Sequence, residues 1–231
     1  MKISFEEMYS KTYYELYQTD MAKGVFLKYL GDGKDILDIL KDNRFPTVGR
    51  RNSDLAKIWL CTHFLSDKTN RLFAVGCCRL IWNLIDESYI NALIVTKKLL
   101  LGDSSTQELQ AAKAEAEEQK NNSDNIICEV IRDATWGEVN ESKDRAWFVS
   151  NNIANLRKSY APDIEELKSD METSIQAIWK MDLEKEVREE VLEEEEEKWE
   201  ENIRNVRNKE WQDAWKAQVE ILIKNIEEYG F

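Results

Sequence analysis

The side chains best suited to chemistry are one histidine and four cysteines. His63 is the only imidazole, and with Cys61, Cys77 and Cys78 it offers the nitrogen and sulfur ligands that zinc prefers. The spacing disfavours a metal site, because no Cys-x-x-Cys pair occurs and neighbouring residues of a helix point about 100° apart. Cys61 and His63 are two residues apart and face different sides of a helix, which disfavours a nucleophile and its base. We therefore expect these residues to be structural, with no metal.

Other catalytic patterns are absent or cannot be singled out. The chain contains 45 Asp and Glu residues, and most of these carboxylates are expected on solvated faces. It has neither a Gly-x-Gly-x-x-Gly nor a Gly-x-x-x-x-Gly-Lys-Ser/Thr loop, which disfavours nucleotide binding through those motifs. We expect no catalytic residues and no cofactor, and an enzyme of unidentified reaction is the third alternative.

The charge is distributed unevenly along the chain. Of the net charge of −13, residues 1–162 carry about −1 and residues 163–231 carry −12. Basic side chains gather in and beside the loop at residues 42–53, and they are Arg44, Arg50, Arg51 and Lys57. These cations are candidate contacts for phosphate, for an acidic partner or for the acidic last third of the chain. The acidic total disfavours direct nucleic-acid contact and leaves that question open.

Composition predicts an all-α fold. Gly and Pro are scarce, with 8 and 2 residues, and the central stretch Arg71–Ile85 places apolar or small residues in pairs four apart, as on a buried helix. Asp67 and Thr69 are expected to cap that helix. Helices are predicted over residues 4–17, 20–30, 34–41, 53–64, 71–85, 88–101, 105–120, 124–136 and 142–158. No apolar run approaches the roughly 18 residues of a membrane span, so we expect a cytoplasmic protein without membrane contact.

The last third predicts long helices. Residues 163–229 contain neither Gly nor Pro, and an apolar stripe at helical spacing is interrupted by Glu193–Glu197. We expect a bend near this run or around Asn202–Asn208, giving two antiparallel helices. The predicted organisation is a globular domain at residues 1–160 and an acidic helical arm at 161–231, packed on the domain or on a second copy.

The arm carries more apolar surface than the globular domain needs to cover. A homodimer is therefore expected, since long helices with one apolar seam often bury it against another copy. The predicted interface residues are Trp199, Trp211, Trp215, Val219 and Leu222, together with Glu193, Glu194 and Glu195.

The central helix also resembles a known sequence pattern. The string from Leu72 to Trp82 resembles an uncharacterised all-helical module of bacterial proteins, of the type found in planctomycete multi-domain chains, with the pattern Leu-Phe-Ala-x-x-Cys-Cys-Arg-x-Ile-Trp. Gly102-Asp103 and the closing stretch Gln218–Phe231 are similar to later parts of that module. Residues 87–118 are more faintly similar to helical immunity proteins of toxin systems. The module implies a helical fold, and it provides no activity or catalytic residues to carry over.

These observations favour a non-catalytic protein that binds other proteins. The first hypothesis is an accessory or adaptor protein of a bacterial, defence-type assembly, whose partner is a larger, basic effector that handles nucleic acid. The second is an immunity protein that neutralises a basic toxin, since an acidic chain would associate rapidly with such a partner.

Overall fold

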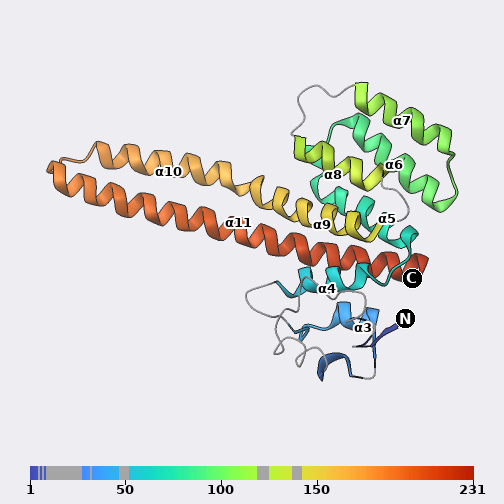
Figure 1. Ribbon diagram of the computed structural model, residues 1–231. Helices are drawn as coiled ribbons and strands as arrows, with labels where there is room; N and C mark the ends of the chain where they lie inside the picture. The colour runs from blue at the N-terminus through green and yellow to red at the C-terminus, as the bar shows by residue number, and fades with distance from the viewer. Residues whose placement is uncertain are drawn as a thin grey trace. The chain divides into compact units, whose positions relative to one another are not determined.

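The computed structural model describes residues 1–4, 6, 8, 28–31, 33–46, 52–118, 125–136 and 142–231. Within these ranges the fold is all-α, as the composition predicts (Figure 1). Most of the predicted helix at 4–17 and most of that at 20–30 lie outside the described residues. The chain divides into two compact units: unit 1 is Met1–Ile153 with Trp215–Phe231, and unit 2 is Ala154–Ala214. This division differs from the expected one because the last 17 residues belong to unit 1.

Unit 1 begins with a short antiparallel pair of strands, β1 (Lys2–Ile3) and β2 (Lys34–Asp35), in which Lys2 pairs with Asp35. The other elements that lie wholly in unit 1 are α3 (Ile36–Lys41), α4 (Ser53–Thr62), α5 (Asp67–Cys78), the 3₁₀ helix η1 (Arg79–Leu84), α6 (Glu87–Leu101), α7 (Thr106–Glu118) and α8 (Asn125–Trp136). Helix α9 (Ser142–Ser159) passes from unit 1 into unit 2, and α10 (Asp163–Trp179) lies in unit 2. Helix α11 (Lys185–Tyr229) begins in unit 2 and ends in unit 1.

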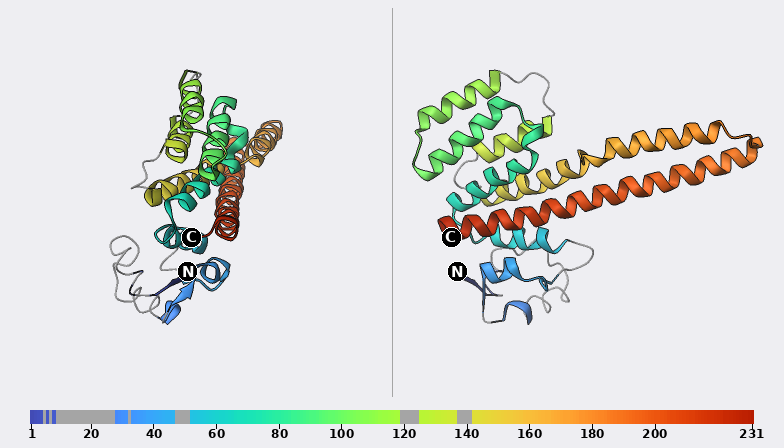
Figure 2. Two further views of the ribbon diagram at one scale, coloured as in Figure 1. Left: turned by 90° about the vertical axis from the view of Figure 1, so that its right-hand side faces the viewer. Right: turned by 180° about the vertical axis from the view of Figure 1, so that it is seen from behind.

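Helix α5 is the buried centre of unit 1, as its sequence predicts. Leu72, Phe73 and Cys77 are at most 3% exposed, and α5 packs against both α6 and α8 (Figures 1 and 2). Its start differs from the prediction: Ser66 is the N-cap, and its hydroxyl accepts from the backbone N–H of Thr69. The α conformation ends at Cys78, after which the chain continues as η1.

The end of α11 completes the core of unit 1. Gly76 of α5 lies so close to this segment that a Cβ there would stand 2.8 Å from a methyl carbon of Ile221. Thr69 donates a 3.1 Å hydrogen bond to the carbonyl of Gly230, and Lys41 forms a 2.8 Å ion pair with Glu227. Helices α5 and α11 can approach closely because residue 76 has no side chain.

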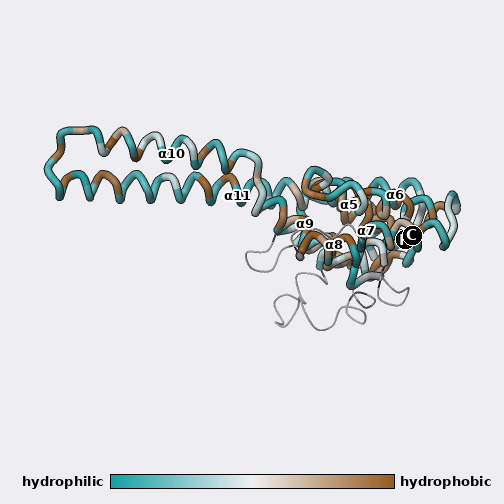
Figure 3. The backbone as a smooth tube through the Cα atoms, turned by 90° about the horizontal axis from the view of Figure 1, so that it is seen from above, coloured by the Kyte–Doolittle hydropathy of each residue, from teal (hydrophilic) through white to brown (hydrophobic). Residues whose placement is uncertain are grey.

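Unit 2 contains a helical hairpin made of α10 and the first part of α11, which run side by side and antiparallel (Figures 1 and 2). Brown and teal residues alternate along both helices in Figure 3, as expected for helices with one apolar seam. Ile164 and Ile178 of α10 are 3% and 7% exposed. We call α10 and residues 185–214 the acidic hairpin.

The position of the bend corrects the prediction. The chain reverses at residues 180–184, and α11 is one helix of 45 residues that runs through both Glu193–Glu197 and Asn202–Asn208. Glutamate is a good helix former, so five in succession do not end a helix. None of the described helices is both long enough and apolar enough to cross a membrane.

Candidate protein-docking surface

The turn of the acidic hairpin is built by one arginine. Trp179 ends α10, and the backbone N–H groups of Lys180 and Met181 donate 3.1 Å bonds to carbonyls three residues earlier. Arg188, in the first turn of α11, donates from one guanidinium nitrogen to the carbonyls of Met181 and Leu183, each at 3.1 Å. The guanidinium of Arg188 also lies 5.5 Å from the centre of the Trp179 ring. Arg188 therefore binds the carbonyls of the turn and holds the tryptophan beside it.

Three large apolar side chains at this turn are exposed to solvent. Trp179, Met181 and Val187 are 59%, 50% and 43% exposed. We call these three residues the turn patch. Single exposed apolar residues are common, but three within nine residues, one of them tryptophan, are typical of a surface that binds a partner.

The turn patch lies at the start of the most acidic part of unit 2. Unit 2 holds 19 acidic and 10 basic residues, and 12 of the acidic residues with three of the basic ones lie in residues 182–201. The net charge of −9 for unit 2 therefore arises wholly within these 20 residues. A dense negative field around an apolar patch attracts positively charged partners and repels acidic ones.

The three predicted acidic interface residues differ in their surroundings. Glu193 and Glu194 are exposed on α11 and free to face a partner. Glu195 is directed to its own helix, where it accepts 2.7 Å from the indole N–H of Trp199 and 3.2 Å from the ammonium of Lys198. These hydrogen bonds, first that from Trp199, lower the pKa of Glu195. Glu195 therefore helps to position Trp199 and is not a free contact.

The structure corrects the prediction that Trp215, Val219 and Leu222 form an interface, because all three are buried within the chain. Trp215, Val219 and Leu222 are 0%, 6% and 0% exposed and belong to the core of unit 1. Trp215 stacks on Trp147 of α9, with ring centres 5.7 Å apart and planes 24° apart. A dimer seam cannot use side chains that the chain itself already covers.

Two further predicted interface tryptophans, Trp199 and Trp211, are half-buried within unit 2. A charged pair near the second of them, Arg157 and Glu210, joins α9 to α11 inside this unit at 2.5 Å. The Glu210 side chain is 15% exposed. Trp199 and Trp211 therefore contribute mainly to the hairpin itself, and the exposed apolar surface lies at the turn patch.

The predicted cation contacts also differ in their exposure to solvent. The Arg44 side chain is 91% exposed and lies 3.4 Å from Asp42. Lys57 is 3% exposed and forms a 3.0 Å ion pair with Asp54, so it is a core residue and cannot meet a phosphate or an acidic partner. Arg50 and Arg51 lie outside the described residues. Of the two described residues, only Arg44 is therefore exposed enough to contact a partner.

Cys61, Cys77, Cys78 and Cys128 are free thiols and all are buried. Burial raises the pKa of the Cys78 thiol to about 12 and raises that of Cys77 well above its ordinary value. The imidazole of His63 forms a 2.7 Å hydrogen bond through Nδ1 with the carbonyl of Trp59 and packs on its ring, 4.5 Å between centres. Among the described residues, no three His, Cys, Asp or Glu side chains are grouped as metal ligands.

Comparison with known proteins gives no relative from which a site could be transferred: no protein-family model, no curated protein and no solved structure matches the chain significantly. The candidate site therefore rests on geometry. The interface predicted from the sequence did not include Trp179, Met181 or Val187. Trp179 is one of four tryptophans in the acidic last third, and Val187 lies in its apolar stripe. The sequence feature that could have identified the turn patch is the cluster of large apolar residues directly beside Asp182-Leu183-Glu184, where the helix stripe is interrupted.

Proposed function

We propose that this chain is a protein-binding adaptor whose acidic hairpin docks onto a positively charged protein surface. The observation that carries the proposal is the turn patch, three exposed apolar side chains at the start of a 20-residue segment, residues 182–201, of net charge −9. The tryptophan supplies apolar contact area, and the surrounding carboxylates supply the sign of charge that the partner must complement.

The two features act at different stages of binding. Carboxylates on the exposed faces of α11 attract a basic partner over about 8–10 Å at ordinary salt and raise the association rate. Burial of the turn patch then slows dissociation, because burying a large apolar side chain contributes about 1.5–3 kcal/mol. Arg188 holds the Trp179 side chain in place before binding, which lowers the entropy cost of ordering the contact.

The same charge argues against two other partners for this surface. A second copy would bring another net charge of −9 against the first, so a homodimer through the hairpin turn is disfavoured. Nucleic acid would be repelled for the same reason. A toxin-neutralising immunity protein is the second candidate function, because a basic toxin would meet the same apolar and acidic surface.

Affinity capture with matched variants tests the proposal. The whole chain, the double variant Trp179→Ser/Met181→Ser and the control Tyr160→Ser are each used as bait in extracts of the source cells at low and high salt. Tyr160, at the start of the hairpin, is 47% exposed. Its replacement by serine also removes an exposed aromatic side chain but leaves the turn patch intact. Bound proteins are identified by mass spectrometry, then purified and titrated against each bait by calorimetry.

We expect a basic protein that binds the parent and the Tyr160→Ser control equally and loses at least tenfold in affinity to the double variant. Its affinity should also fall as salt rises. The proposal is wrong if the double variant binds every purified partner as tightly as the parent, or if the partners bound through the patch are acidic.

A further inference from the structure

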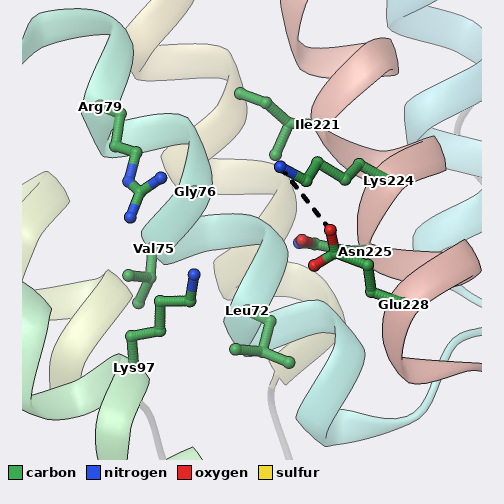
Figure 4. A pocket seen from close by; sticks show the side chains of 9 residues that line it. All are labelled: Leu72, Val75, Gly76, Arg79, Lys97, Ile221, Lys224, Asn225 and Glu228. Atoms are coloured by element: carbon green, nitrogen blue, oxygen red, sulfur yellow. Dashed lines mark ion pairs between the residues drawn. The ribbon is translucent and has the colours of Figure 1, made fainter.

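Unit 1 contains a cavity of about 300 Å³ between α5, η1, α6 and the end of α11 (Figure 4). Leu72, Val75 and Gly76 of α5 and Ile221 of α11 form its apolar wall. Ile221 packs close to the backbone of Gly76, which brings the α5 and α11 sides of the cavity together. The volume is at the lower end of the range for small-molecule sites in proteins.

Two cations point into one side of this cavity. Figure 4 shows the guanidinium of Arg79 and the ammonium of Lys97 directed toward one another, one from η1 and the other from α6. Neither forms an ion pair with a carboxylate of the described residues, whereas Lys224, on the opposite side, is paired with Glu228 at 3.6 Å. In a chain of net charge −13, two unneutralised cations facing the same cavity are typical of an anion site.

A third polar group lies at the same cavity. The amide nitrogen of Asn225 is closed off from solvent and has no hydrogen-bond partner among the described residues. An unpaired buried donor is costly, so an acceptor that reaches it would be stabilised. The carboxylate of Glu228 at the rim disfavours a dianion such as a phosphate monoester.

We propose that this cavity binds a medium-chain carboxylate, with its apolar chain on Leu72, Val75 and Ile221 and its carboxylate between Arg79 and Lys97. The chain length that fits the volume is roughly eight carbons. This site is separate from the turn patch and does not depend on the proposed protein partner.

Titration of the whole protein with octanoate tests the site, followed by calorimetry and by amide chemical shifts. Octanamide, which has the same shape without charge, and acetate, which lacks the chain, are the comparison probes. The variants are Arg79→Met and Lys97→Met, which remove a cation and keep an apolar stem. The control is Lys98→Met, because Lys98 is exposed on the same helix and does not line the cavity.

We expect saturable octanoate binding at least tenfold tighter than that of octanamide or acetate, with shifts at Leu72, Val75 and Ile221. Arg79→Met and Lys97→Met should each weaken it by about fivefold to tenfold, and Lys98→Met should leave it unchanged. Equal binding of octanamide, shifts confined to residues outside the cavity, or an equal loss in Lys98→Met would overturn the proposal.

Discussion

Removal of the indole should cost much more stability at one tryptophan of this chain than at another. Trp215 is fully buried in unit 1 and stacks on Trp147, whereas Trp179 is 59% exposed in unit 2. Truncating a buried tryptophan to alanine costs about 3–5 kcal/mol, because apolar contact is lost and a void remains. The Trp179→Ala change removes its contact with Arg188, which at an exposed site contributes about 0.5–1 kcal/mol.

Urea unfolding followed by far-ultraviolet circular dichroism measures both changes, and light scattering on the same samples measures the oligomeric state. Since whole domains are stable by about 5–15 kcal/mol, the Trp215→Ala variant should lose a large part of the stability of unit 1. Its oligomeric state should equal that of the parent. A Trp215→Ala variant of parental stability, or one that stays folded while a parental dimer separates, would refute the assignment of Trp215 to the core.

Three further predictions concern unit 1. Gln218→Ala should destabilise unit 1 by about 1–3 kcal/mol. The buried amide of Gln218 contacts the Ser150 hydroxyl and donates a 3.1 Å hydrogen bond to the Ser150 carbonyl, and alanine makes neither contact. Gln218→Glu should not reach the stability of the parent at neutral pH. The hydrogen bond from Lys34, with those from the backbone of Arg44 and from Tyr29, holds the pKa of Asp42 below its usual range. The Asp42 carboxylate therefore stabilises the fold fully above its unfolded pKa of about 3.9. This stabilisation is lost as the pH falls through the lower folded pKa, so the stability of Asp42→Asn should fall less steeply with acid than that of the parent. The buried thiols should react with Ellman's reagent at the rate of unfolding, and fast reaction of native protein would contradict their burial.

Much of the fold follows from the sequence, and particular residues show why. Leu72, Phe73 and Cys77 recur at helical spacing and are buried, because few polar residues interrupt that face of α5. Leu109, Ala112 and Ala116 of α7 are spaced three and four residues apart, as on one face of a helix, and they are at most 5% exposed. The local spacing of apolar residues therefore decides which face of such a helix is buried.

The remaining features depend on contacts that periodicity does not report. The bend at residues 180–184 is stabilised by Arg188, which reaches back along the chain to two carbonyls. The acidic run was expected to interrupt the helix, but each glutamate favours the helical state and Glu195 is bound by Trp199.

The sequence left open whether the last helix packs on its own chain or on a second copy. Trp215, Val219 and Leu222 form a stripe that has the same spacing whether it is buried within one chain or between two. The structure places it against α5 and α9 of the same chain, because Gly76 allows close approach and Trp147 provides a stacking partner. Sequence spacing predicts that a face is buried, and only tertiary contacts identify what covers it.

Hydrogen–deuterium exchange of the chain, free and bound to the purified basic partner, shows whether the turn patch is the docking surface. We expect the amides protected on binding to fall in residues 177–190, around the turn patch, and Trp179→Ser/Met181→Ser to abolish this protection. Protection confined to other segments, such as residues 36–62, with none at the turn, would contradict it.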